Sequence, residues 1–122
     1  MAEIHHSEGQ GSRLSITQTT VDGIRVLSVA GELDADNVGT LRQALCIEED
    51  SVSALTVLDM GAVSFMDSSA INILVAANRD ASAAGGQLRM AALSEPVQRV
   101  VEIVGLDTII ACYPTLAQAL TI

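Results

Sequence analysis

The sequence predicts an α/β fold in which helices pack against one mixed β-sheet. Near the start of the chain, two β-rich runs are separated by Asp22-Gly23, a strong hairpin signal. After this hairpin, apolar runs typical of buried strands alternate with segments of helical periodicity. Hydrophobic residues make up 49% of the chain, yet Phe65 and Tyr113 are its only aromatic residues. A core of small aliphatic side chains is therefore expected, as in layered α/β proteins.

Five segments have the composition of β-strands. They are residues 13–19, 24–31, 54–60, 87–93 and 108–113. The third of them, ALTVLDM, is apolar enough to lie in the centre of a sheet. Because the first two form a hairpin and the later ones alternate with helices, we expect a mixed sheet of about five strands.

Four helices are expected to pack against this sheet. The first follows the turn GELDADN, and the second begins at about Ser68 and ends at Gly85-Gly86, where glycine allows a left-handed closing residue. The third opens at Ser94-Glu95-Pro96, where the serine hydroxyl is expected to cap the helix, and ends at Gly105. The fourth spans residues 115–120. The residues expected along one face of the first three helices are Val38, Leu41 and Leu45; Ile71, Leu74, Val75 and Asn78; and Val97, Val100, Val101 and Val104.

Domain boundaries follow from composition. Residues 1–12 are polar and contain Gly and Ser, so we expect a disordered N-terminal arm, with residues 13–122 forming one domain. The two histidines, His5 and His6, are expected to be solvated residues of this arm. No apolar run approaches the roughly 18 residues that span a membrane, and the first residues lack a signal-peptide pattern. We therefore expect a soluble, cytoplasmic protein with no membrane partner.

The charge of the chain limits its partners. Fifteen acidic residues against six arginines and no lysine give a formal net charge of −9. Nucleic acid is unsuitable as a partner because binding its phosphates requires clustered cations, whereas a basic protein surface is a better match. Cys46 and Cys112 do not have the spacing of a metal site and are expected to be buried free thiols, with a disulfide or redox pair as the alternative. We predict no metal and no cofactor.

The segment VSFMDSSAINILVA (residues 63–76) places Asp67-Ser68-Ser69 where a strand-like run becomes a helix-like run. A helix cap, an activated nucleophile and an acceptor for a charge-adding modification are the three interpretations. A serine nucleophile needs a base, but the histidines lie in the predicted arm and lysine is absent. The carboxylates of Asp34 and Asp36 lie on a turn and are explained by helix capping. We therefore predict no catalytic residues, with a small serine hydrolase as the enzyme alternative.

The wider pattern resembles the bacterial anti-sigma-factor antagonists, whose fold is the STAS domain. The string FMDSS is followed by GG, then by S-x-x-V-x-R and GL at matching spacings, and GELD upstream is a second signal. The resemblance covers about residues 13–120. It implies that the unphosphorylated chain binds an anti-sigma factor with serine kinase activity and so releases a sigma factor. This would be transcription regulation by partner switching, as in stress responses.

Position by position, the resemblance implies that Ser68 is the phosphorylation site and that a serine phosphatase reverses the modification. Asp67 and Ser69 would flank it in the partner-binding patch, with Glu32 and Asp34 nearby. A phosphate at a helix N-terminus is expected to leave the fold intact while its charge prevents binding.

One residue departs from the family pattern. Ala70 stands where these proteins usually have glycine, and its methyl group is expected to hinder close approach of a partner. The alternative function is that of a STAS module in a stress-signalling scaffold or a transport-regulating complex.

Overall fold

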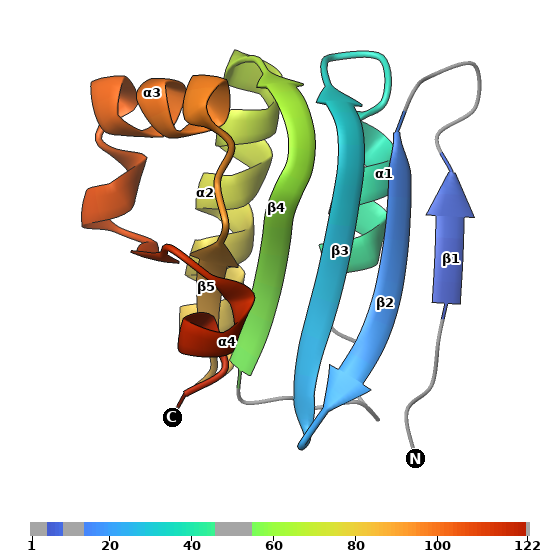
Figure 1. Ribbon diagram of the computed structural model, residues 1–122, viewed down its shortest axis with the longest axis vertical. Helices are drawn as coiled ribbons and strands as arrows, with labels where there is room; N and C mark the ends of the chain where they lie inside the picture. The colour runs from blue at the N-terminus through green and yellow to red at the C-terminus, as the bar shows by residue number, and fades with distance from the viewer. Residues whose placement is uncertain (1–4, 9–13, 46–54, 122) are drawn as a thin grey trace.

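The computed structural model describes residues 5–8, 14–45 and 55–121, which form one mixed sheet and its covering helices (Figure 1). The six strands lie in the order of the chain: β1 (His5–Glu8), β2 (Ser15–Val21), β3 (Ile24–Leu33), β4 (Leu55–Met66), β5 (Gln87–Ala91) and β6 (Ala111–Tyr113). β1, β2 and β3 pair antiparallel, whereas β3, β4, β5 and β6 pair parallel. The predicted α/β class with a mixed sheet is confirmed.

β1 lies inside the predicted arm. It pairs antiparallel with β2, with His5 opposite Gln18 and Glu8 opposite Ser15. The prediction of a disordered arm over residues 1–12 is therefore wrong for residues 5–8. An edge strand is held by backbone hydrogen bonds, which a polar sequence can also make, so composition carried no signal for it.

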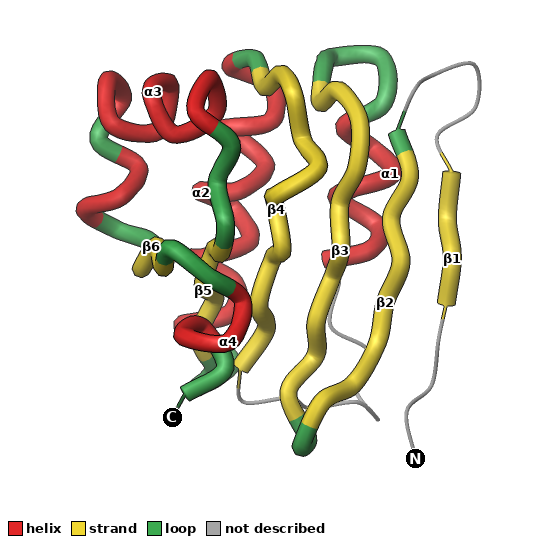
Figure 2. The backbone as a smooth tube through the Cα atoms, viewed as in Figure 1, coloured by secondary structure: helices red, strands yellow, loops and turns green. Residues whose placement is uncertain are grey.

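Helices cover both faces of the sheet (Figure 2). They are α1 (Val38–Leu45), α2 (Ser68–Ala83), α3 (Glu95–Val104), the 3₁₀ helix η1 (Leu106–Thr108) and α4 (Leu116–Ala119). α1 and α2 lie behind the sheet in Figure 1, and α4 lies in front of it. The four predicted helices are present, but the last strand is shorter than predicted because the end of η1 and the turn after it occupy residues 108–110.

The core has two parts, one on each face of the sheet. The larger part joins the sheet to α1, α2 and α3 and includes Leu27, Leu58, Met60, Leu74 and Val101. The smaller part lies under α4 and consists of Ile24, Val26, Leu55, Val57, Ala91 and Ala119. Successive residues of a strand point to opposite faces, so β3 and β4 supply both parts.

The buried face of α2 differs from the predicted one. The prediction named Ile71, Leu74, Val75 and Asn78. The fully buried residues are Ala70, Leu74 and Ala81, while the other three predicted residues are half-buried. Small side chains let the helix approach the sheet closely, and apolar periodicity alone did not distinguish this alanine face from its larger neighbours.

The turns agree with the sequence. Asp22 and Gly23 both have positive φ (51° and 80°), as a two-residue hairpin turn requires. At the end of α2, Gly85 has a φ of 80°, and the backbone N–H of Gly86 donates to the Ala81 carbonyl at 2.8 Å. This is the left-handed helix closure that the glycine pair predicted.

Ser94 occupies the position before α3, but its hydroxyl does not cap the helix. It donates instead to the Val63 carbonyl of β4, with 2.5 Å between the oxygens. The prediction of a side-chain cap is therefore wrong. The hydroxyl joins the start of α3 to the sheet.

Arg25 fastens α1 to the sheet from the second position of β3. Its side chain is only 9% exposed. Its Nη1 and Nη2 atoms donate to the carbonyls of Ala44 and Leu45 at 3.0 and 3.2 Å, and its Nε donates to Thr56 Oγ1 at 3.2 Å. A cation at these carbonyls satisfies acceptors that a helix C-terminus leaves open.

Arg89, a residue of β5, holds the last helix, α4, against the sheet. Its Nη1 atom donates hydrogen bonds to the carbonyls of Ala119 and Thr121 at 2.9 and 2.7 Å. The guanidinium carbon also lies 5.3 Å from the centre of the Tyr113 ring. Arg89 thereby holds the end of the chain against the sheet.

Candidate functional site

The two predicted site segments meet at the carboxyl ends of β3 and β4. These strands are parallel neighbours, with Glu32 opposite Phe65 and Leu33 opposite Met66. Immediately beyond them, the backbone N–H of Asp67 donates to the Leu33 carbonyl at 3.1 Å. The acidic turn, GELDADN (residues 31–37), and the Asp67-Ser68-Ser69 segment therefore lie side by side.

Asp67 is the N-cap of α2. Its Oδ1 atom accepts hydrogen bonds from the backbone N–H groups of Ser69 and Ala70 at 2.9 and 3.3 Å, and its carbonyl accepts from Ile71 at 3.2 Å. The capping interpretation of Asp67 is confirmed.

Ser68 and Ser69 differ in accessibility. Ser68 is the first residue of α2 and is exposed, whereas Ser69 is half-buried and has its backbone N–H bonded to Asp67. A macromolecule therefore reaches the hydroxyl of Ser68 more readily than that of Ser69. This difference agrees with the choice of Ser68 as the predicted acceptor, which stays a prediction.

The acidic turn is held by its own side chains. Asp34 Oδ1 accepts from the backbone N–H groups of Asp36 and Asn37 at 3.0 and 3.2 Å. Asn37 is 3% exposed and its Nδ2 atom donates to the Glu32 carbonyl at 2.7 Å. Asn37 thus fixes the backbone that presents Glu32 and Asp34. The sequence marked GELDADN, which ends at Asn37, as a source of turn and cap residues, but the positioning of Glu32 and Asp34 by Asn37 was not predicted.

Ala70, the departure from the family pattern, points inward. Its side chain is fully buried and belongs to the larger core with Met66 and Leu74. The expectation that its methyl group hinders a partner is therefore wrong, because that group packs against the domain interior.

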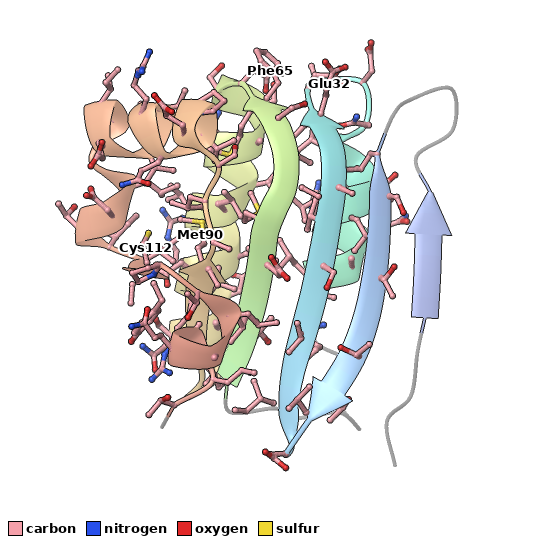
Figure 3. The ribbon with its side chains drawn as sticks, in the orientation of Figure 1. Glu32, Phe65, Met90 and Cys112 are labelled. Carbon is pink, nitrogen blue, oxygen red and sulfur yellow. The ribbon has the colours of Figure 1, made fainter. Side chains whose placement is uncertain are left out.

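Phe65 is exposed at the same end of the sheet. Figure 3 shows Phe65 and Glu32 near the tips of β4 and β3. The Phe65 side chain is 49% exposed, although it lies between the buried residues Val63 and Met66 of β4. From the sequence, Phe65 was noted as one of two aromatic residues and as part of the FMDSS string, but it was given no role.

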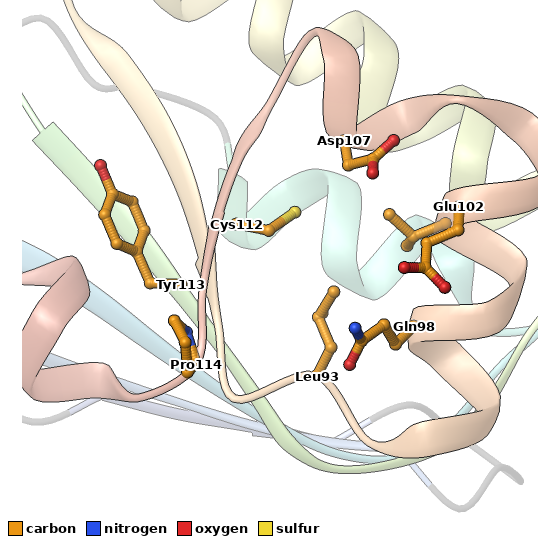
Figure 4. A pocket seen from close by; sticks show the side chains of 8 residues that line it. Leu93, Gln98, Glu102, Asp107, Cys112, Tyr113 and Pro114 are labelled. Carbon is orange, nitrogen blue, oxygen red and sulfur yellow. The ribbon is translucent and has the colours of Figure 1, made fainter.

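A pocket of about 290 Å³ lies between α3 and the segment around β6 (Figure 4). Glu102, Asp107, Cys112 and Tyr113 are among its lining residues, and no lining residue belongs to the acidic turn or to residues 67–69. Burial, together with the charge of Asp107, raises the pKa of the Cys112 thiol. Cys112 is a free cysteine, but it is half-buried rather than buried as predicted, while Cys46 lies outside the described residues. The pocket is thus separate from the predicted patch.

Two further properties of the described residues bear on function. Among residues 5–8, 14–45 and 55–121, no three His, Cys, Asp or Glu side chains gather in a way that could hold a metal ion. None of the helices in this part of the chain is both long and apolar enough to cross a membrane.

Comparison with known proteins identifies the family. The sequence profile of the STAS domain matches residues 15–119, which is most of the chain. The chain belongs to the STAS domain family. The resemblance inferred from FMDSS and GELD is therefore confirmed at the level of the domain.

Three relatives of this STAS domain are named as anti-sigma factor antagonists. The anti-sigma-F factor antagonist RsfB of Mycobacterium tuberculosis is 34% identical over 110 residues, which is 88% of each chain. The anti-sigma-B factor antagonist of Listeria monocytogenes is 30% identical over 97 residues, covering 80% of this chain and 84% of the relative. The crystal structure of an anti-sigma factor antagonist from Mycobacterium paratuberculosis superposes with a TM-score of 0.81 at 28% identity, covering 93% of this chain and 96% of that one.

Proposed function

We propose that this STAS protein is an anti-sigma-factor antagonist that binds through the surface formed by Glu32, Asp34, Asp67, Ser68 and Ser69. The observation that carries the proposal is the hydrogen bond from Asp67 N–H to the Leu33 carbonyl, at 3.1 Å, which brings the two halves of this surface together. Relatives of at least 30% identity named as antagonists support it. The protein acts by binding, in the cytoplasm, and not as an enzyme.

Phosphorylation of Ser68 is the proposed switch. Two N–H groups of the first turn of α2 already bond to Asp67, so those two do not neutralise a phosphate on the neighbouring serine. The phosphate adds about 1.5 to 2 negative charges on the exposed surface beside the Asp67 carboxylate. Enclosing that charge in an interface costs several kcal/mol, whereas a hundredfold loss of affinity needs only about 2.7 kcal/mol.

The competing functions predict different partners. A stress-signalling scaffold or a transport-regulating complex would hold this domain in a large assembly, while a hydrolase would need a base beside Ser68. We therefore purify the tagged chain from its native host and identify bound proteins by mass spectrometry. An anti-sigma factor with a serine kinase fold supports the proposal, and a multi-subunit complex without one contradicts it.

The phosphorylation step is tested with that purified anti-sigma factor, ATP and phosphosite mapping. Ser68→Ala should bind but take up no phosphate, and Ser68→Glu should fold and bind poorly because it imitates part of the added charge. Ser69→Ala is the matched control and should still be phosphorylated. Phosphate on Ser69 alone would overturn the assignment of Ser68. A serine phosphatase should restore binding of the phosphorylated chain.

A further inference from the structure

Two irregularities in β4 determine where Phe65 points. Asp59 pairs with Ser28 but Ala62 with Ala30, and Val63 pairs with Gly31 but Phe65 with Glu32. At each of these steps β4 contains one residue more than β3, so each step is a β-bulge. The pairing register, and with it the face to which side chains point, shifts twice in the last seven residues of the strand.

The second bulge turns Phe65 outward. Strict alternation from the buried Val63 would place Phe65 in the core and Met66 outside. The extra residue, Ser64, reverses this, so that Met66 is 3% exposed and Phe65 is 49% exposed. The strand therefore presents its aromatic side chain to solvent although a regular strand would bury it.

The surroundings of Phe65 are acidic. Glu32 is its cross-strand neighbour, and the adjoining segments carry Asp34, Asp36 and Asp67. Within the described residues, none of these four carboxylates forms an ion pair with an arginine. The surface around Phe65 thus combines an apolar centre with a negative rim whose carboxylates form no ion pair with a described arginine.

We propose that Phe65 is the apolar anchor of the contact with the anti-sigma factor, and that it inserts into an apolar pocket rimmed by arginine or lysine side chains. The inference rests on the proposed function and adds the chemistry of the partner surface. Buried aromatic side chains at the centre of an interface commonly dominate its affinity, while charged groups at the rim steer association. The outward aromatic ring and the unpaired carboxylates match these two roles.

The position of the anchor also relates to the switch. Phe65 is the second-to-last residue of β4 and lies three residues before Ser68, the first residue of α2. When the ring enters an apolar pocket, water leaves the neighbouring surface, and charges there interact more strongly. A phosphate on Ser68 would then lie at the edge of a dry contact.

Because the chain has a single phenylalanine and a single tyrosine, the contact can be observed without mutation. The chain is labelled with fluorophenylalanine or fluorotyrosine and titrated with the purified anti-sigma factor, and ¹⁹F spectra are recorded. The Phe65 signal should shift on binding, whereas the signal of Tyr113, which lines the α3–β6 pocket, should keep its position. An unshifted Phe65 signal in a formed complex, or equal shifts of both signals, overturns the proposal.

Variants give the size of the effect. Phe65→Ala should raise the dissociation constant roughly thirtyfold, as expected for an interface hot spot. Phe65→Tyr should bind nearly as well as the wild type. Ile109→Ala is the matched control, because Ile109 is equally exposed (51%) but lies beyond η1. Melting temperatures show whether each variant is folded, and high salt should weaken wild-type binding through the rim charges.

The result separates this inference from the proposed function. If Ser68→Glu loses binding while Phe65→Ala binds like the wild type, the domain is an antagonist but Phe65 is not its anchor. If the dissociation constant does not change between low and high salt, the proposal that the partner's pocket has a cationic rim is wrong. If the wild type does not bind the anti-sigma factor, both proposals fall.

Discussion

The two ends of the central strands use charge in opposite ways. Arg25 near the start of β3 and Arg89 in the middle of β5 direct their guanidinium groups to backbone carbonyls of the helix ends nearby. At the carboxyl ends of β3 and β4, carboxylates cluster, and within the described residues none forms an ion pair with an arginine. One sheet therefore holds cations beside the carboxyl ends of its helices and anions where β3 and β4 lead into the amino-terminal ends of α1 and α2.

This difference separates stability from binding. The arginine contacts satisfy buried and partly buried carbonyl acceptors at helix ends, so their loss should weaken the fold. The carboxylates of Asp34 and Asp67 accept hydrogen bonds only from backbone N–H groups close to them in the chain. Their removal should therefore chiefly weaken binding to a partner whose surface carries cations. The four predictions below test this separation, from the largest expected effect to the smallest.

Leu74→Ala tests the core that both ends share. Leu74 is fully buried in the larger core, so we expect a loss of roughly 2–5 kcal/mol in the free energy of unfolding. Denaturant titration measures the loss, with the half-buried Val75→Ala as a milder control. Folded protein at low temperature should keep its affinity. A loss below that of Val75→Ala would mean that α2 does not pack on the sheet as described.

Arg25→Met tests the amino-terminal end. The substitution leaves the carbonyls of Ala44 and Leu45 without their donor, which should cost about 1–3 kcal/mol. Affinity for the anti-sigma factor should stay unchanged in isothermal titration. Arg42→Met, at an exposed position of α1, should change neither quantity. A selective loss of affinity in Arg25→Met would break the separation between the two ends.

Asp34 tests the carboxyl end with two substitutions. Asp34→Ala removes the acceptor for Asp36 and Asn37 and should cost about 1 kcal/mol, as loss of a helix cap does. Asp34→Asn keeps an oxygen at this position and should melt near the wild type. Both should weaken binding more than folding, because both remove the charge. Equal effects on melting temperature and affinity would assign Asp34 to capping alone.

The smallest expected effect is a shift in the pH at which the Cys112 thiol reacts. Cys112 lines the α3–β6 pocket, away from the acidic turn. Its raised pKa means that the folded state favours the neutral thiol. The resulting stability is fully present below the pKa of the unfolded chain and is lost as the pH rises through the folded pKa. Iodoacetamide should therefore label Cys112 at a higher pH in the folded chain than in urea, as followed by peptide mass mapping. Identical pH profiles would contradict burial of this thiol.

Local signals predicted much of the fold. The Asp22-Gly23 turn, the glycines after α2 and the alternation of apolar strands with amphipathic segments each act within a few residues, and their structures agree with the prediction. The cap at Asp67 was predictable for the same reason. The family resemblance, and not a local signal, predicted that GELD and FMDSS lie close together. In the structure, the parallel pairing of β3 and β4 brings them together.

Features that depend on distant partners were not predictable. The Ser94 hydroxyl bonds to Val63, a residue 31 positions away, so its local cap signal was misleading. The β4 bulges exist only in relation to β3, and period-two alternation cannot show them. Phe65 was consequently read as part of a motif, whereas its exposure follows from the pairing of two strands.

The edge of the sheet at β1 has a consequence for handling the protein in solution. β2 has the sequence SITQTTV, which contains no charge and four β-branched side chains in addition to valine. β1 occupies the free side of this strand. A chain shortened by its first ten residues would retain the larger core, yet it would expose an uncharged strand edge of seven residues. Such edges pair with other molecules, so the shortened protein should precipitate slowly at high concentration even where its thermal unfolding is nearly unchanged.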